Sequence, residues 1–216
     1  PRDGERGQCR RGAELGAEGW GWDQVLPWFI ASEDQQRGAS EYHGVGGPLA
    51  VQDLRHTNPL SAVFLDAAEQ AGHPRTDDFN GEHQRGVAYY QVTQRDGRRC
   101  SAAVAYLRPA MERDNLTVIT KAPACQLLLE GRSVLGVRVR HKGKLRDFIG
   151  GETILCGGAI NSPQLLMLSG IGPADHLREL GIPVTLDSPG VGANLQDHLD
   201  VCTVVKCREK ITYDTL

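Results

Sequence analysis

Apolar residues in the first half of the chain recur with the spacing of helices. Large apolar groups are dense over residues 19–33, where Asp23 lies at a position suited to capping a helix. A second, clearly amphipathic helix is predicted to start at Asn58-Pro59, because its apolar residues recur every three or four positions. It is expected to end at Gly72, since glycine favours the left-handed position after a helix.

The middle of the chain changes to a pattern that predicts strands, and short helices follow it. The expected strands are Leu49–Leu54, Val87–Thr93, Leu116–Thr120, Gln126–Leu129, Val134–Arg140, a weaker Leu145–Ile149, Glu152–Cys156 and, near the end, Val201–Val205. The expected short helices are Ser101–Leu107, interrupted by Pro109, then Ser162–Leu168 and Pro173–Leu180. This order predicts an α/β fold with α+β character.

Residues 1–16 differ from the rest of the chain. They are rich in Arg, Gly and Glu and have almost no apolar periodicity, so we expect this segment to be loose. The chain opens at Pro1 rather than methionine, and its last predicted strand is followed only by a short polar tail. We therefore expect both ends to be internal to a longer protein.

Charge and hydropathy narrow the class of partner. The 216 residues include 24 basic and 27 acidic side chains, a formal net charge of −3, and they contain no basic block that would attract a nucleic acid. No apolar run approaches the roughly 20 residues that span a bilayer, and the start has no signal-peptide core. A small-molecule partner and a cytoplasmic location are the expectations, with peripheral membrane attachment of a full-length parent left open.

Cysteine and histidine spacing gives no metal site. The six cysteines are scattered, without close pairs, and are expected to be reduced structural thiols. None of the seven histidines has the spacing of a zinc motif, and His176 is expected on the polar face of a short helix. A serine hydrolase is also disfavoured, because Ser169 follows a helix and lacks the glycine of a nucleophile elbow.

The most informative stretch is 153–172, a predicted buried strand that runs through Gly157-Gly158 into a helix. Glycine lets a ligand or a second backbone approach closely, and amides at a helix start favour an anion or polar group. Turn chemistry alone favours a purely connective turn over a nucleotide site.

Residues 158–172 closely resemble the second sequence motif of the glucose–methanol–choline oxidoreductases. Residues 19–27, 96–109 and 189–198 are similar to the choline and alcohol dehydrogenase branch, so that the resemblance covers roughly 15–208. It implies that a Rossmann-like domain holds FAD and that a second, mixed-sheet domain covers the flavin. The implied reaction is oxidation of an alcohol, choline or a primary alcohol, by hydride transfer to flavin N5, with electrons passed to quinone or oxygen.

The resemblance also divides the chain. It implies a loose, atypical segment at 1–14, part of the substrate domain at 15–115, part of the FAD domain at 116–172, and at 173–216 a connection into the substrate-domain sheet. The FAD domain is expected to be incomplete here.

Single positions follow from the resemblance only in part. The segment Lys121–Ala124 matches the place where relatives meet adenine through backbone atoms, and Gly157-Gly158 matches the turn that backs the nucleotide. Asn194 and Asp197 match a loop near the cofactor. The cofactor-binding candidates are thus Ala124, Gly157, Gly158, Asn194 and Asp197. For His198, a structural role is favoured over proton transfer, because sequence neighbours rarely form a catalytic pair.

Several family features have no counterpart in this sequence. The G-x-G-x-x-G turn and the histidine near the family's carboxyl terminus are both missing, so we assign no catalytic residue. Cys100 stands where close relatives often have tryptophan. Turnover by this chain alone is expected to be nil. The alternative is a non-catalytic fragment or interaction protein that retains part of the fold and exposes sheet edges.

Overall fold

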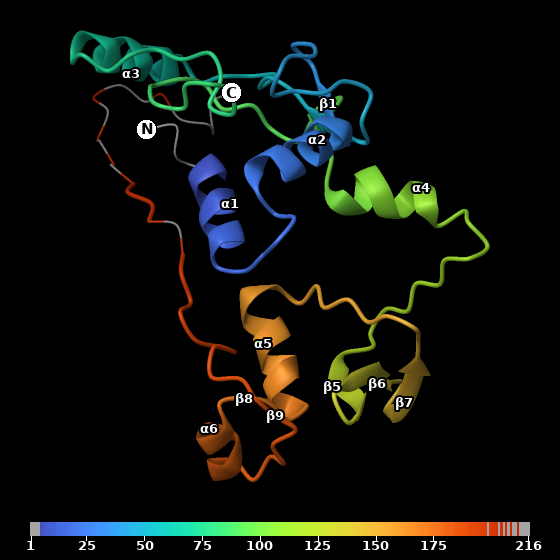
Figure 1. The fold of residues 1–216 in the computed structure, drawn as a ribbon. Helices are drawn as coiled ribbons and strands as arrows, with labels where there is room; N and C mark the ends of the chain where they lie inside the picture. The colour runs from blue at the N-terminus through green and yellow to red at the C-terminus, as the bar shows by residue number, and fades with distance from the viewer. Residues whose placement is uncertain are drawn as a thin grey trace. The chain divides into compact units, whose positions relative to one another are not determined.

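A computed structural model describes residues 5–197, 199–202, 204, 206, 208 and 211 (Figure 1). The chain divides into two compact units. The first contains residues 1–117 and 205–216, and the second contains 118–204. Each unit is described by itself.

The first unit opens with a helix that the sequence analysis did not predict. Helix α1 spans Glu5–Glu14, so the expectation of a loose segment over 1–16 was wrong for these residues. Glutamate, arginine and glutamine are good helix formers, and no proline interrupts the segment. An exposed ion pair between Arg10 and Glu14, at 3.0 Å, adds a few tenths of a kcal/mol, about 0.3.

Helix α2 spans Trp22–Ser32 and leads directly into a short strand. Its N-cap is Gly21 rather than Asp23, and the Gly21 amide donates to the Gln24 side chain at 2.9 Å. The prediction that Asp23 is the cap was wrong, although its carboxylate in the first turn still favours the positive end of the helix dipole. Strand β1, Glu33–Gln35, then pairs in parallel with β2, Leu49–Val51.

Helix α3 spans Pro59–Gln70 and confirms the predicted start and end. The Asn58 side chain accepts a hydrogen bond from the Leu60 amide at 2.9 Å, and Gly72 follows with φ +89°. The buried face differs from the predicted apolar stripe, which runs through Leu60, Val63, Phe64, Ala67, Ala68 and Ala71. Val63 and Phe64 are 61% and 68% exposed. Leu65, between two predicted stripe positions, is 5% exposed instead.

The strand expected at Val87–Thr93 is absent, because this segment makes only isolated bridges, Gln52 with Val92 and Arg75 with Val87. The next residues form a small hairpin of β3, Gln94–Arg95, and β4, Arg98–Arg99. Both residues of its turn, Asp96 and Gly97, have positive φ, as such tight hairpins require.

A π-helix, η1 (Ala103–Leu107), continues without a break into α4 (Arg108–Ala110). The Ser101 hydroxyl accepts from the Val104 amide at 3.4 Å, as expected of a cap. Pro109 does not interrupt this helical segment, which runs through it to Ala110, so the expected interruption was wrong. Ala50, Cys100 and Ala105 form a small core beside it, so Cys100 is buried.

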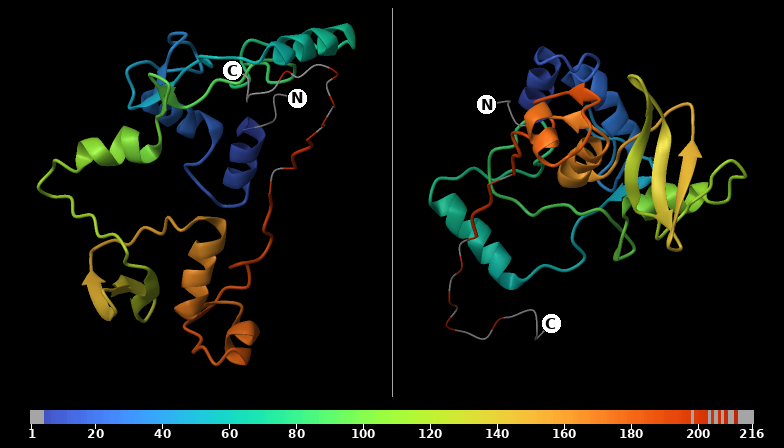
Figure 2. Two further views of the ribbon diagram at one scale, coloured as in Figure 1. Left: turned by 180° about the vertical axis from the view of Figure 1, so that it is seen from behind. Right: turned by 90° about the horizontal axis from the view of Figure 1, so that it is seen from below.

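The second unit contains a three-stranded antiparallel sheet, ordered β5-β6-β7, whose strands lie side by side in Figure 2. Strand β5 spans Ala124–Glu130, β6 spans Ser133–His141 and β7 spans Lys144–Ile149. These strands confirm the three predicted runs in this part of the chain. Gly131 and the Lys142-Gly143 pair make the two turns, all with positive φ.

Two other predicted strands are not present. Leu116–Thr120 and Glu152–Cys156 have no strand partner among the described residues and form connections without regular secondary structure. Both are rich in β-branched residues, but a strand exists only where a second strand supplies the ladder hydrogen bonds.

Helices α5 and α6 complete the second unit. Helix α5 spans Gly158–Leu168, starting four residues before the predicted Ser162, and α6 spans Ala174–Glu179 as predicted. Strand β8, Ile171–Gly172, pairs in parallel with β9, Leu186–Asp187. The strand expected at Val201–Val205 lies partly, and His198 wholly, outside the described residues. None of the helices described here is long and apolar enough to cross a membrane.

Candidate functional site

A cavity of about 540 Å³ in the second unit contains two of the five residues expected to meet the cofactor. Ala124 opens β5, and Gly157 is the N-cap of α5, so a strand start and a helix start share this cavity. The lining consists of Pro123, Ala124, Val137, Thr153, Ile154, Leu155, Cys156, Gly157, Asn161, Ser162, Gln164, Leu165 and Leu168.

The turn at Gly157-Gly158 depends on glycine at both positions. A Cβ on Gly157 would lie 3.1 Å from the Asn161 Cβ and from the Ser162 nitrogen, which is a crowded contact. Gly158 has φ +80°, a conformation that other residues rarely adopt, and open space where its Cβ would be. The Gly157 amide donates to the Ser162 hydroxyl at 3.0 Å. The first-turn amides of α5 have no intrahelical acceptor, as at any helix start.

No charged side chain lines this cavity. Its polar groups are neutral hydroxyl, amide and thiol groups beside aliphatic side chains. Such a lining suits a flat, uncharged ring that is held by backbone atoms. It does not suit a pyrophosphate, which requires cationic side chains or a clustered set of amides.

The remaining candidates lie elsewhere in the same unit. Asn194 has φ +54°, and both Asn194 and Asp197 are exposed. Neither of them lines the cavity of Ala124 and Gly157. His176 is exposed on α6, as expected.

Ser169 has a structural role. Its hydroxyl donates to the Leu165 carbonyl at 2.6 Å and accepts from the Leu127 amide at 2.8 Å. It therefore fastens the end of α5 to the middle of β5. Buried with both hydrogen bonds made, it is not available as a nucleophile.

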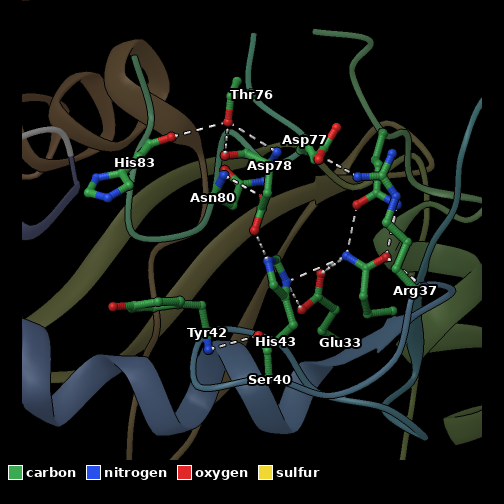
Figure 3. Close-up of polar contacts among 12 residues, drawn as sticks. Glu33, Arg37, Ser40, Tyr42, His43, Thr76, Asp77, Asp78, Asn80 and His83 are labelled. Carbon is green, nitrogen blue, oxygen red and sulfur yellow. Dashed lines mark hydrogen bonds and ion pairs between the residues drawn. The ribbon is translucent and has the colours of Figure 1, made fainter. Parts of the chain in front are cut away.

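The first unit contains a polar cluster that the sequence analysis did not single out (Figure 3). His43 is 8% exposed and lies between two carboxylates. Its Nδ1 is 2.7 Å from the Glu33 Oε2, and its Nε2 is 2.9 Å from the Asp78 Oδ2. Glu33 comes from β1, His43 from the loop before β2, and Asp78 from a loop that follows α3.

The two distances from the ring nitrogens to carboxylate oxygens favour one protonation state of His43. A neutral imidazole donates from one nitrogen only, so its other nitrogen would meet a carboxylate oxygen lone pair to lone pair. Burial lowers the pKa of His43, but hydrogen bonds and charge from Glu33 and Asp78 outweigh it and raise the pKa above 6.5. Below this raised pKa the cluster is carboxylate–imidazolium–carboxylate.

A second polar group adjoins this cluster. Gln35 and Gln91 exchange amide hydrogen bonds of 2.9 Å, and Gln91 also donates to Asp53. Arg37 pairs with Asp53 at 2.7 Å, and its hydrogen bond lowers the pKa of that carboxyl group despite some burial. Arg37 also donates to the Asp77 carbonyl.

The clue to His43 in the sequence was weak: one histidine before the glycines of a loop. A Cβ on Gly44 would lie 1.8 Å from the Ile30 carbonyl oxygen, and one on Gly47 would lie 2.5 Å from the Glu33 oxygen. Glycine is therefore required for this loop to pack on the junction of α2 and β1. The carboxylates flank the ring rather than converge, and the described residues contain no set of three groups that could hold a metal.

A larger, apolar cavity of about 710 Å³ also lies in the first unit. Phe64, Phe79, Tyr89 and Tyr90 contribute aromatic rings to its wall. The rings of Phe79 and Tyr90 are 4.9 Å apart between centroids and tilted by 32°. Phe79 directly follows Asp78 in the chain.

Comparison with known proteins places the chain in a family. The model of the GMC oxidoreductase family matches residues 10–200. The chain belongs to the GMC oxidoreductase family. It is 46% identical over 198 residues to the mitochondrial choline dehydrogenase of Homo sapiens, covering 91% of this chain and 33% of that protein. It is 47% identical over 192 residues to an alcohol dehydrogenase (acceptor) of Pseudomonas putida, covering 87% and 35%.

Solved structures agree with this assignment. Pyridoxine 4-oxidase from Mesorbium loti superposes with a TM-score of 0.80 at 36% identity, over 85% of this chain and 37% of that one. An FAD-dependent oxidoreductase from Chaetomium thermophilum gives 0.79 at 26% identity, over 87% and 35%. This GMC chain thus spans about a third of the length of the curated relatives, as 33% of the human protein indicates.

Proposed function

We propose that this chain is part of an FAD-dependent dehydrogenase that oxidises an alcohol, and that its second unit contributes to the nucleotide site. The class of reaction is inferred from membership of the GMC oxidoreductase family. The cavity shared by Ala124 and Gly157 is the single structural observation that supports a cofactor role for this chain.

The cavity fits one part of FAD better than the others. Its uncharged wall, the small Ala124 side chain and the glycine turn suit the adenine ring. The flavin, when bound, would supply the hydride acceptor. In this proposal the chain's own residues bind and orient the adenine end, with Asn194 and Asp197 contributing from their loop. No residue here is assigned to the chemical step.

The names of the relatives suggest the substrate class. The human relative is a choline dehydrogenase, and that of Brucella ovis is an oxygen-dependent choline dehydrogenase, 46% identical over 202 residues. Choline or a primary alcohol is therefore the proposed substrate of the complete protein. Oxygen or another acceptor, such as a quinone, would receive the electrons. A cytoplasmic location remains part of this proposal.

The first experiment is a titration of the purified chain with FAD, following flavin fluorescence and the melting temperature. Saturable quenching together with a raised melting temperature is expected, because a ligand that binds only the folded state stabilises it. Ala124→Tyr should weaken binding roughly tenfold or more, since the ring would occupy part of the space that Ala124 lines. Adenosine diphosphate should compete with FAD if the adenine end is the part that is bound.

The matched control is Val134→Tyr, on the neighbouring strand β6 and outside the cavity lining. Tyrosine has a high strand propensity at both positions, so both variants should fold. Equal FAD affinity for the two variants would contradict the proposed site. If the wild-type chain is folded, as a cooperative melting transition would show, and still does not bind FAD, a cofactor role for this chain by itself is contradicted.

A further inference from the structure

The contact between His43 and Asp78 joins two parts of the first unit that are distant in sequence. The two residues are 35 positions apart, and they connect the loop before β2 to the loop that carries Phe79. Glu33, on the other side of the ring, is also held by Gln35 at 3.2 Å and by the Gly44 amide at 3.3 Å. The Glu33 side of the cluster is therefore fixed without His43.

The Asp78 side depends on His43 to a greater degree. Asp78 Oδ1 accepts from the Asn80 amide at 2.8 Å, and Thr76 donates to the Asp78 and His83 carbonyls, but these bonds lie within the loop itself. Gly81 permits this arrangement, since a Cβ there would lie 2.6 Å from the Asp78 Oδ2. The link from Asp77 to Arg37 is a separate attachment.

We propose that Glu33, His43 and Asp78 form a proton-dependent clamp that holds the loop 76–83, and with it Phe79, against the junction of α2 and β1. Both nitrogens of the ring face carboxylate oxygens, and only the imidazolium donates to both. When the ring loses its proton, one donor disappears and two carboxylates flank a neutral ring. The more exposed carboxylate, Asp78, then separates into water.

The groups that face His43 are the carboxylates of Glu33 and Asp78 and the amide of Gln35. The nearby cation Arg37 is paired with Asp53, so the charge at the cluster is set by the ring and its two carboxylates. A small cavity of about 180 Å³ has His43, Glu33 and Asn80 in its wall.

The sign of the pH dependence follows from the raised pKa. Because the folded-state pKa of His43 lies above the usual 6.5, the clamp is complete below that value and is lost as pH rises through the folded pKa. Its loss frees Phe79 from its place beside Tyr90 in the wall of the apolar cavity. The shape of that cavity therefore depends on pH, whether or not FAD is bound.

Hydrogen exchange of the intact chain, measured by mass spectrometry at about pH 6 and about pH 9, tests the clamp in the range where histidine titrates. After correction for the intrinsic pH dependence of exchange, amides of 76–83 should exchange roughly tenfold faster at the higher pH, as expected for a lost charge-assisted hydrogen bond. Helix α3 is the internal reference and should show no such step.

Three variants, one of them a control, separate the clamp from general destabilisation. His43→Gln should leave 76–83 loose at both pH values, whereas His56→Gln, at an exposed histidine of the same unit, should behave as wild type. Asp78→Asn keeps the side-chain shape, but its amide can accept from the imidazolium and can also donate to the neutral ring, so the pH step in the exchange of 76–83 should disappear. That variant decides the question if His43→Gln does not fold.

Histidine Cε1–H NMR titration of the wild-type chain provides an independent readout. The signal that His43→Gln removes should titrate above 6.5 in the wild type. A titration below that value, an unchanged pH step in His43→Gln, or an unchanged pH step in Asp78→Asn would each overturn the clamp.

Discussion

Ser169 and His43 show how two polar residues can both be buried and yet differ in kind. Ser169 is neutral, makes both of its hydrogen bonds within the second unit and connects α5 to β5. His43 lies between two carboxylates that raise its pKa, so its contribution changes with pH. From the sequence, Ser169 could be considered only as a possible nucleophile. Its role in holding α5 to β5 depends on the position of β5 in the tertiary structure.

Ser169→Ala should destabilise the second unit by about 1–3 kcal/mol, because it leaves the buried Leu127 amide without its acceptor. Urea unfolding of the intact chain, followed by circular dichroism, measures this cost. Ser162→Ala is the control, since the exposed Gly157 amide it releases can bond to water, and its cost should stay below about 0.5 kcal/mol. Equal costs for the two variants would contradict the fastening role.

Elements that carry their own caps or turns were predicted correctly, whereas strand-like runs with no turn to bring a partner alongside were not. Helix α3 begins at a side-chain cap and ends before a glycine, and the turns of the β5-β6-β7 sheet contain glycine at positive φ. Leu116–Thr120 and Glu152–Cys156 have a strand propensity comparable to that of the strands in this sheet. They nevertheless have no neighbouring strand among the described residues. For helix α1 the error was the opposite one, because a structured element was missed. Its residues favour a helix, but the prediction gave more weight to the absence of an apolar stripe.

Gly136 in β6 and Gly131 in the preceding turn provide a test at this scale. A Cβ on Gly136 would lie 2.0 Å from the Phe148 carbonyl oxygen of β7, so Gly136→Ala should cost about 1–3 kcal/mol through displaced backbone. Gly131→Ala meets nothing within 4 Å and should cost about 1 kcal/mol through its positive φ alone. Thermal unfolding compares the two; a smaller loss for Gly136→Ala would contradict the β6–β7 register.

The whole molecule is organised as two units, and cavities lie within each of them. The chain passes from one to the other near Thr117, within the exposed stretch 111–121, which has no regular secondary structure after α4. The correspondence of these units to the cofactor and substrate domains predicted at 15–115, 116–172 and 173–216 stays a prediction.

Limited trypsin digestion tests this organisation. Exposed segments without backbone hydrogen-bond ladders are cut first, so Arg113 and Lys121 should be early cleavage sites. Arg138 and Arg140 in β6 should be cut later, because their backbone is paired in the sheet. Mass spectrometry of the first fragments identifies the sites, and initial cleavage within β6 would contradict two compact units joined at this stretch.

The sequence by itself determined the family, the three strands of the second unit, and the ends of α3, because motifs, turns and caps are properties of neighbouring residues. It also indicated Ala124 and Gly157, and the fold brings them to one cavity. Only the tertiary structure decided which face of α3 is buried and which strand-like runs find partners. It alone assembled Glu33, His43 and Asp78, since the contacts of His43 span 10 and 35 residues of sequence and no local pattern encodes them.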